Sequence, residues 1–305
     1  MNFGISTAWQ SGQLDDGHAL LDSIAATGLR GLEIDYRVTG AMLKQMLPRL
    51  HSSEFQVLTV HNYCPLPPGY TKADAVSILN LASLDEEERK TAVKYGKKSL
   101  QWAADLGAKL VVFHFGKIDM HYDAEELFAF YHQGQLQSST FHTWLQQKFA
   151  ERANLAQNHL PRLLRSIDTL HAEAFRLGVL MGAENRYRFT QMPFGDEFDA
   201  LFNEFAGGQL RYWHDLGHAE IYHRLQILDH EKDFLARWQP HLEGFHLHDV
   251  LDLQDHLAPG TGDFDFDLLK PYIKPDMIRI FEIHSMADAG QIKQGVSLLQ
   301  QKGLL

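Results

Sequence analysis

The 305-residue chain has a single cysteine, Cys64, so it can form neither an internal disulfide bond nor a thiolate metal cluster. We expect Cys64 to be a small buried apolar side chain, as free cysteines usually are. The sequence also lacks an apolar run of about eighteen residues, which a membrane-spanning helix needs, and its first residues do not resemble a signal peptide. These absences predict a cytoplasmic protein that does not enter a membrane.

Positive charge is scarce, because 28 Lys and Arg stand against 39 Asp and Glu and give a formal net charge of -11. A negative field repels polyanions, so we do not expect nucleic acid as a partner, although a local basic groove can persist under a negative total. No linker or internal repeat divides the chain, and we predict one domain over residues 1–305. A homo-oligomer is compatible with the sequence.

Short apolar runs alternate with longer helical patterns along the chain, and eight of the runs are candidate strands. Several helical patterns end at a glycine that suits a left-handed C-terminal position, as at Gly28, Gly107 and Gly178. This alternation predicts a parallel sheet, and the repeated units predict an α/β fold, a single closed (β/α)8 TIM barrel. The candidate strands are residues 3–7, 31–35, 57–61, 110–114, 179–184, 211–215, 244–248 and 278–283.

Two connections are longer than a simple strand-to-helix unit needs. They follow the third and fourth candidate strands and cover residues 62–88 and 115–154. Both leave the C-terminal ends of their strands, where barrel active sites are built. We expect these extended loops to shape or cover a pocket; packed surface excursions are the alternative.

Six candidate strands carry a ligand-type side chain at or near their C-terminal ends. These side chains are His61, His114, Glu184, Asp215, His246 and Glu282. In a parallel barrel the strand ends meet at one mouth, where gathered carboxylates and imidazoles would repel or remain unpaired unless a cation joined them. Oxygen and nitrogen ligands without sulfur suit Zn, Mn, Co or Mg. The pattern therefore predicts a site for a divalent metal.

The motifs at these strand ends resemble, in order and spacing, those of the xylose-isomerase-like TIM barrel family. They are GAENRY, WHDLGH, FHLHD, PGTGD and FEIH, and the resemblance covers essentially the whole chain. The family contains sugar isomerases and epimerases, inosose dehydratases and, as a more distant branch, DNA-repair phosphodiesterases of the endonuclease IV type. Because one fold hosts several activities, the resemblance implies the fold more firmly than the reaction.

The resemblance implies that Glu184, Asp215, His246 and Glu282 hold the metal. It leaves open whether His61, His114 and His218 contact the substrate or, together with His256, hold additional ions as the matching histidines do in the endonuclease branch. That branch has a carboxylate two residues before the histidine that matches His256. Here this position is Gln254, with Asp255 one position out of register and Asp249 as the other possible substitute.

The expected substrate contacts differ from those of the ketose epimerases. Those enzymes usually have an arginine soon after the metal-binding histidine, whereas residues 249–278 contain none. His248, Asp249 and His256 suit a neutral, hydroxyl-rich substrate or more metal better than a phosphate. The segment PGTGDFDFD has backbone N–H groups that suit a phosphate, but its aspartates favour a turn that caps the last helix. The substrate-binding candidates are His61, His114, Arg186, His218 and His248.

Three further charged positions lie near candidate strand ends. Glu33, near the end of the second candidate strand, either lies in the pocket or pairs with Arg30 or Arg37. Lys117 and Arg186, which follow strand-end candidates, are the nearest cations for a substrate oxygen.

Three carboxylates and one histidine leave positions open on a metal for two substrate oxygens, and such chelation acidifies the carbon between them. Glu184 and Glu282 are the catalytic candidates, one removing a proton and the other returning it. We therefore predict a metal-dependent isomerase or epimerase of carbohydrate metabolism, acting on a sugar, polyol or keto acid. The alternative is a multi-metal phosphoesterase resembling abasic-site endonucleases, which the 18 histidines favour and the net charge opposes. A metal-stabilised binding protein is the third interpretation.

Overall fold

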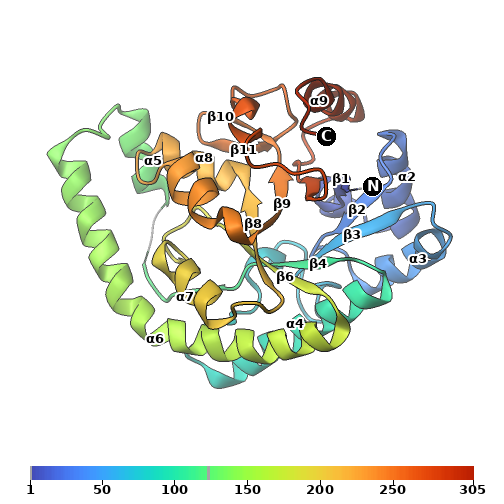
Figure 1. Ribbon diagram of the computed structural model, residues 1–305, viewed down its shortest axis with the longest axis horizontal. Helices are drawn as coiled ribbons and strands as arrows, with labels where there is room; N and C mark the ends of the chain where they lie inside the picture. Colours follow the sequence, from blue (N-terminus) through green and yellow to red (C-terminus); the bar gives the residue numbers. More distant parts are fainter. Residues whose placement is uncertain (1, 122–123) are drawn as a thin grey trace.

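The computed structural model describes residues 2–121 and 124–305. Eight parallel strands close into a barrel in the order β1-β12-β9-β8-β6-β4-β3-β2, and helices cover its outside (Figure 1). The strands are β1 Phe3–Ser6, β2 Gly31–Ile34, β3 Gln56–His61, β4 Leu110–Phe113, β6 Leu180–Glu184, β8 Leu210–Asp215, β9 Leu242–Leu247 and β12 Ile278–Phe281. All eight predicted strands and the predicted (β/α)8 barrel are confirmed, with strand ends shifted by at most two residues.

Most of the helices begin at side chains that accept hydrogen bonds from the first turn, as the capping rules require. The chain forms α1 Ala8–Ser11, α2 Gly17–Ala26, α3 Gly40–His51, α4 Glu86–Asp105, α5 Ala124–His132, α6 Ser139–Leu177, α7 Asp196–Glu204, α8 Leu216–Arg224 and α9 Ala289–Gln301. Shorter 3₁₀ turns cover Ala75–Ser77, Gln239–His241 and Phe266–Leu269, and His230–Ala236 is a π-helix. Gly28, Gly107 and Gly178 have φ of 87°, 70° and 68°, which confirms the predicted left-handed helix ends.

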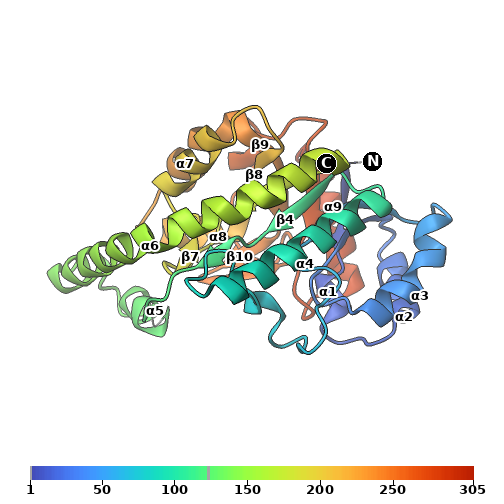
Figure 2. The ribbon, with the colours of Figure 1, turned by 90° about the horizontal axis from the view of Figure 1, so that it is seen from below.

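The connection after β4 contains the largest departure from the sequence prediction. The sequence predicted an extended connection over residues 115–154. This prediction is wrong for residues 139–154, because α6 already begins at Ser139 and continues for 39 residues. Ser138 caps it by accepting a hydrogen bond from the backbone N–H of Phe141. At about 1.5 Å per residue the helix is about 58 Å long. Figure 2 shows α6 passing alongside α4 and continuing beyond the barrel, with α5 near its far end.

The extended connections after β4 and β6 are joined by a small two-stranded sheet. Strand β5, Gly116–Lys117, pairs antiparallel with β7, Gln191–Met192, and Lys117 lies opposite Gln191. Arg152 of α6 supports this sheet, because its guanidinium donates to the backbone oxygens of Phe189 and Gln191. The two connections therefore form one wall at the C-terminal end of the barrel.

The barrel interior is apolar at one end and polar at the other. Six side chains, which we call the apolar plug, pack together inside it: Leu58, Leu110, Val112, Trp213, Ile278 and Ile280. Gly244 makes room for the Trp213 ring, because a Cβ at this glycine would lie 2.4 Å from a ring carbon. Polar side chains, among them Asp215 and Glu282, lie beyond the plug, further along the same strands.

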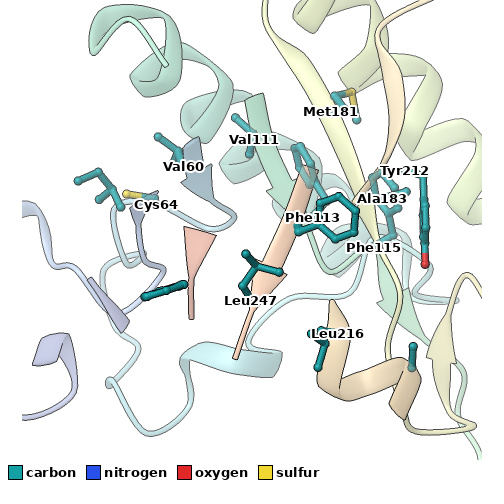
Figure 3. Close-up of a cluster of buried hydrophobic side chains, with 14 of the residues drawn as sticks. Val60, Cys64, Val111, Phe113, Phe115, Met181, Ala183, Tyr212, Leu216 and Leu247 are labelled. Carbon is teal, nitrogen blue, oxygen red and sulfur yellow. The ribbon is translucent and has the colours of Figure 1, made fainter. Parts of the chain in front are cut away.

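A larger core lies between the strands and the surrounding helices. Figure 3 shows part of it, where Phe113 and Phe115 lie beside Ala183 of β6. The two phenylalanine rings stack with centroids 5.3 Å apart. Cys64 belongs to this core and is 1% exposed, as predicted, and Phe245 is fully buried in it. Among the described residues, no helix is long and apolar enough to cross a membrane.

Candidate metal centre

Four of the predicted residues form a buried cluster at the C-terminal end of the barrel. Ligand atoms of Glu184, Asp215, His246 and Glu282 all lie within 4.8 Å of one another. His246 Nδ1 lies at the middle of the group, 2.9 Å from Glu282 Oε2, 3.3 Å from Glu184 Oε1 and 3.6 Å from Asp215 Oδ2. We call these four residues the central cluster.

The central cluster has the chemistry of a cation site. Three carboxylates and one imidazole are at most 5% exposed, and burying that much negative charge is costly unless a cation neutralises it. Asp215 Oδ2 is buried without a hydrogen-bond partner, although its carboxylate is ionised, because nearby His218 and His248 outweigh burial and hold its pKa well below the usual value. The donor set and this unpartnered oxygen fit a divalent ion.

Glu33 supports His246 from the opposite side of the imidazole ring. Its Oε2 lies 3.2 Å from His246 Nε2 and accepts a hydrogen bond from the Thr59 hydroxyl at 2.9 Å. It does not pair with Arg30 or Arg37, because Arg30 donates to backbone oxygens and Arg37 pairs with Asp35. A carboxylate behind a histidine fixes which ring nitrogen faces a metal, and here it directs Nδ1 at the central cluster.

Asp215 connects the central cluster to the start of α8. Its Oδ1 accepts a hydrogen bond from the His218 backbone N–H at 2.8 Å and caps the helix, which leaves Oδ2 facing the cluster. Asn185 fixes the same segment, because its side chain accepts from the Asp215 N–H and donates to the Asp215 carbonyl. This Asn185 contact was not foreseen from the sequence, where an asparagine beside Glu184 has no distinctive pattern.

A second group, His61, His114 and Glu184, lies against the central cluster and also has ligand atoms within 4.8 Å of one another. Glu184 Oε2 lies 2.7 Å from His114 Nε2 and 3.5 Å from His61 Nε2. Arg186 is inserted here, with its Nη1 2.6 Å from His114 Nε2 and 3.2 Å from Glu184 Oε1. Burial and Arg186 lower the pKa of His114 to about 3, so this ring is neutral and able to accept.

A third group consists of His218, Asp255 and His256. Strands β10, Asp249–Leu251, and β11, Gln254–Leu257, form a hairpin whose register is irregular. His256 has a φ of 57°, and the hairpin brings Asp255 toward the two histidines despite its shift by one position. The sequence mismatch at Gln254 therefore does not remove a carboxylate from this group.

Asp249 is committed to a structural role. Its carboxylate accepts hydrogen bonds from the backbone N–H groups of Gly260, Gly262 and Phe264. Asp249 therefore does not replace the carboxylate expected at position 254, and the two glycine N–H groups of the PGTGD turn are directed at Asp249 instead of a phosphate. Of the following aspartates, Asp265 caps the 3₁₀ turn Phe266–Leu269 and not the last helix. Asp263 pairs with Arg224, and Asp267 pairs with Lys302.

Most of the predicted substrate-binding residues surround a cavity of about 150 Å³ above the central cluster. His114, Arg186, His218, His256 and Glu282 line it. His61 and His248 are fully buried outside this lining. His248 Nε2 lies 3.1 Å from Asp215 Oδ1, and its Nδ1 accepts from the His256 N–H, a position suited to orienting Asp215.

Several lining residues were not foreseen as a group. Tyr36 and Arg37 follow β2, Arg188 follows β6, and His284 follows β12. Each lies just past a strand end, which is the sequence signal that could have identified it. Burial and the neighbouring His256 lower the pKa of His284 to about 4, so its ring is neutral.

The model of the xylose isomerase-like TIM barrel family matches residues 21–302 of this chain. Searching curated protein sequences gave no match. Among solved structures, a D-tagatose 3-epimerase-like protein has 18% identity and a TM-score of 0.68, covering 99% of this chain and 96% of its own. The 3-keto-D-glucoside 4-epimerase from E. coli has 16% identity and a TM-score of 0.66, with 99% of both chains covered. A Thermus thermophilus protein soaked with ZnCl2 has 20% identity and a TM-score of 0.61, with 99% of this chain and 97% of its own covered. At these identities the likeness shows the fold alone.

Proposed function

We propose that this chain, which belongs to the xylose isomerase-like TIM barrel family, is a metal-dependent isomerase or epimerase that moves a proton beside the carbonyl group of a sugar or sugar-like polyol. The observation that carries the proposal is the central cluster, where Glu184, Asp215, His246 and Glu282 converge below the cavity. These four residues would hold one divalent ion, Mn, Zn, Co or Mg. The cytoplasmic location expected from the sequence is part of the same proposal.

A divalent ion bound in the central cluster supplies Lewis acidity that makes a hydrogen beside a carbonyl more acidic. The protein supplies the groups that carry the proton. Glu282 lines the cavity, so its carboxylate is placed to remove a proton from a bound substrate. Glu184 stands on β6, separated from β12 by β9 and β8, and approaches from another side to return a proton.

The surroundings of Glu184 suit such a role. Arg186 Nη1 lies 3.2 Å from Glu184 Oε1, and His114 Nε2 lies 2.7 Å from Glu184 Oε2. Their contacts fix its orientation, which matters because a proton carrier must lie within hydrogen-bond reach of the reacting carbon. The epimerases among the structural relatives support a sugar as the substrate class.

The proposal is tested by incubating the protein with a ketose or an inosose in deuterated water. We expect deuterium at the exchanging carbon, and Glu184→Gln and Glu282→Gln should each suppress product formation, because an amide is nearly isosteric but cannot accept a proton. In an epimerase, one variant should still wash out substrate deuterium without forming product. Near-normal turnover by both variants would refute the proton-carrier roles.

A second candidate function, a multi-metal phosphoesterase, is favoured by three further ligand groups, one that includes His114 and two that share His256. Against it, Arg186 places a guanidinium among His61, His114 and Glu184, where a second cation would otherwise lie. Metal analysis of the purified protein separates the two functions. One equivalent supports the isomerase or epimerase, whereas two or three equivalents of zinc with nicking of an abasic-site duplex would support the phosphoesterase.

A further inference from the structure

The cavity above the central cluster is bordered by cations on one side. Arg37, Arg186 and Arg188 line it, and Lys117 lines an adjoining hollow that shares Val76, His114 and Gln191 with it. The carboxylates that line the two hollows are Asp255 and Glu282, and both belong to the ligand groups described above. The remaining border is therefore positive, in a chain whose net charge is -11.

The four cations differ in their partners. Arg37 pairs with Asp35 at 3.2 Å, and Arg186 pairs with Glu184 at 3.2 Å. Within residues 2–121 and 124–305, no carboxylate lies within ion-pair distance of Arg188 or Lys117. Both side chains are exposed, so their charges are available to a ligand.

The small sheet β5–β7 places Arg188 and Lys117 on the same wall. Lys117 lies opposite Gln191 in that sheet, and a turn returns Arg188 to Gln191, whose N–H donates to the Arg188 carbonyl. The Gln191 side chain accepts from the Arg188 N–H at 3.1 Å and closes the turn. Arg152 holds the wall from behind through the carbonyls of Phe189 and Gln191. The cations thus stand on a supported surface at the cavity's edge.

The segment after β9 also borders this cavity, through Asp255 and His256. That segment contains no arginine between residues 249 and 278, and Asp249 occupies the N–H groups of its glycine turn. In that segment His256 lines the cavity, but its ring nitrogens face Asp255 and Glu282, at 3.0 and 3.4 Å. Among the described residues, Arg188 and Lys117 at the β5–β7 wall have no such carboxylate partner. Guanidinium and ammonium groups both bind phosphates and carboxylates through charge-assisted hydrogen bonds.

We propose that Arg188 and Lys117 bind an anionic substituent, a phosphate or a carboxylate, at the end of the substrate remote from the reacting carbon. The inference rests on the proposed function and narrows its substrate class from neutral sugars to sugar phosphates or sugar acids. It replaces the sequence-based expectation of a neutral, hydroxyl-rich substrate, which rested on His248, Asp249 and His256.

Calorimetric titration of the metal-loaded protein tests the inference with three ketoses that differ at one end: D-fructose, D-fructose 6-phosphate and D-fructuronate. We expect at least one anionic ketose to bind about tenfold more tightly than fructose. Added salt should reduce this advantage, because it screens exposed charges. Arg188→Gln and Lys117→Gln should each remove most of it, judged by the ratio of the two Kd values. The matched control is Arg165→Gln, an equal charge change at an exposed position of α6.

Equal Kd values for all three ketoses, or an advantage that survives the Arg188→Gln/Lys117→Gln double variant, would overturn the inference. Inorganic phosphate separates this failure from failure of the proposed function. Phosphate that binds through Arg188 and Lys117, and still binds to the Asp215→Asn protein, would support the anion site even if no ketose exchanged deuterium. Deuterium exchange without any anion advantage would leave the proposed function standing alone.

Discussion

The two ends of the barrel interior are built by the same strands and have opposite chemistry. On β8, Trp213 belongs to the apolar plug and Asp215, two residues later, belongs to the central cluster. On and just after β12, Ile280 and Glu282 repeat this arrangement. Because side chains two apart on a strand point to the same face, each pair projects into the barrel at successive levels. A step of two residues thus separates the apolar plug from the proposed metal site.

The buried polar side chains of the central cluster lie directly above a layer of closely packed apolar side chains. The plug side chains are at most 5% exposed and fill the barrel below the carboxylates. Substitutions in the plug should therefore change the free energy of unfolding, whereas isosteric substitutions in the central cluster should change metal binding or turnover.

The largest contrast is expected on β12. Glu282→Gln should lower turnover about a hundred- to ten-thousand-fold, the usual contribution of a general acid–base group, with little change in the free energy of unfolding. Its matched control, Ile280→Val, should lose about 0.5–1.5 kcal/mol of stability and keep its turnover. Steady-state kinetics and urea unfolding on both proteins check the pair. If Glu282→Gln instead lost stability and Ile280→Val lost turnover, the separation of stabilising and catalytic side chains along β12 would be wrong.

The next effect concerns the plug side chain of β8. Trp213→Ala should destabilise the protein by about 3–5 kcal/mol, because it leaves a cavity beside Gly244 that the closed barrel cannot collapse to fill. Urea unfolding measures this loss. If the variant is too unstable to purify, Trp213→Phe, which leaves a smaller cavity, should show a reduced loss. An unchanged midpoint for Trp213→Ala would contradict the account of the plug.

Two residues further along β8, Asp215→Asn should leave the protein folded but weaken metal binding by at least about a hundredfold, since it removes an anionic ligand. Asparagine also caps helices well, so α8 should keep its start. Metal content after dialysis and circular dichroism test both statements. Full stoichiometric metal in the variant would remove Asp215 from the ligand set.

The smallest effect is expected for Glu33, which touches the central cluster only through His246. Glu33→Gln should weaken metal binding about ten- to a hundredfold, as loss of a carboxylate behind a metal-binding histidine typically does. Thr59→Val, which removes the hydroxyl that donates to Glu33, is expected to act in the same direction and less strongly. Competition with a fluorescent chelator gives both affinities, and unchanged values would make Glu33 a packing residue.

The strands and the polar strand ends were predictable because each depends on local sequence. An apolar run bounded by a glycine predicts a buried strand without knowledge of its neighbours, and parallel strands necessarily bring their ends together. This reasoning found the central cluster, since Glu184, Asp215, His246 and Glu282 all stand at or near such ends.

Features that depend on contacts between distant segments were not predictable. The position of Asp255 follows from the irregular β10–β11 hairpin, whose register cannot be read from residue spacing. The partner of Glu33 is His246, 213 residues away in the chain, while Arg30 and Arg37 are close in sequence and were the nearer suggestions. The early start of α6 was missed because its first turns owe their stability to packing and to the Ser138 cap more than to a strong apolar pattern.

Asp215 has one oxygen in the cap of α8 and the other in the central cluster. Fraying of the first turn of α8 and release of a bound ion would therefore occur together, in one local opening event. Occupancy of the cluster should slow hydrogen exchange at the capped amide of His218, while amides on the far side of the barrel keep their rates. The exchange lifetime of that amide would then report how long the ion stays bound, without any need to know the substrate.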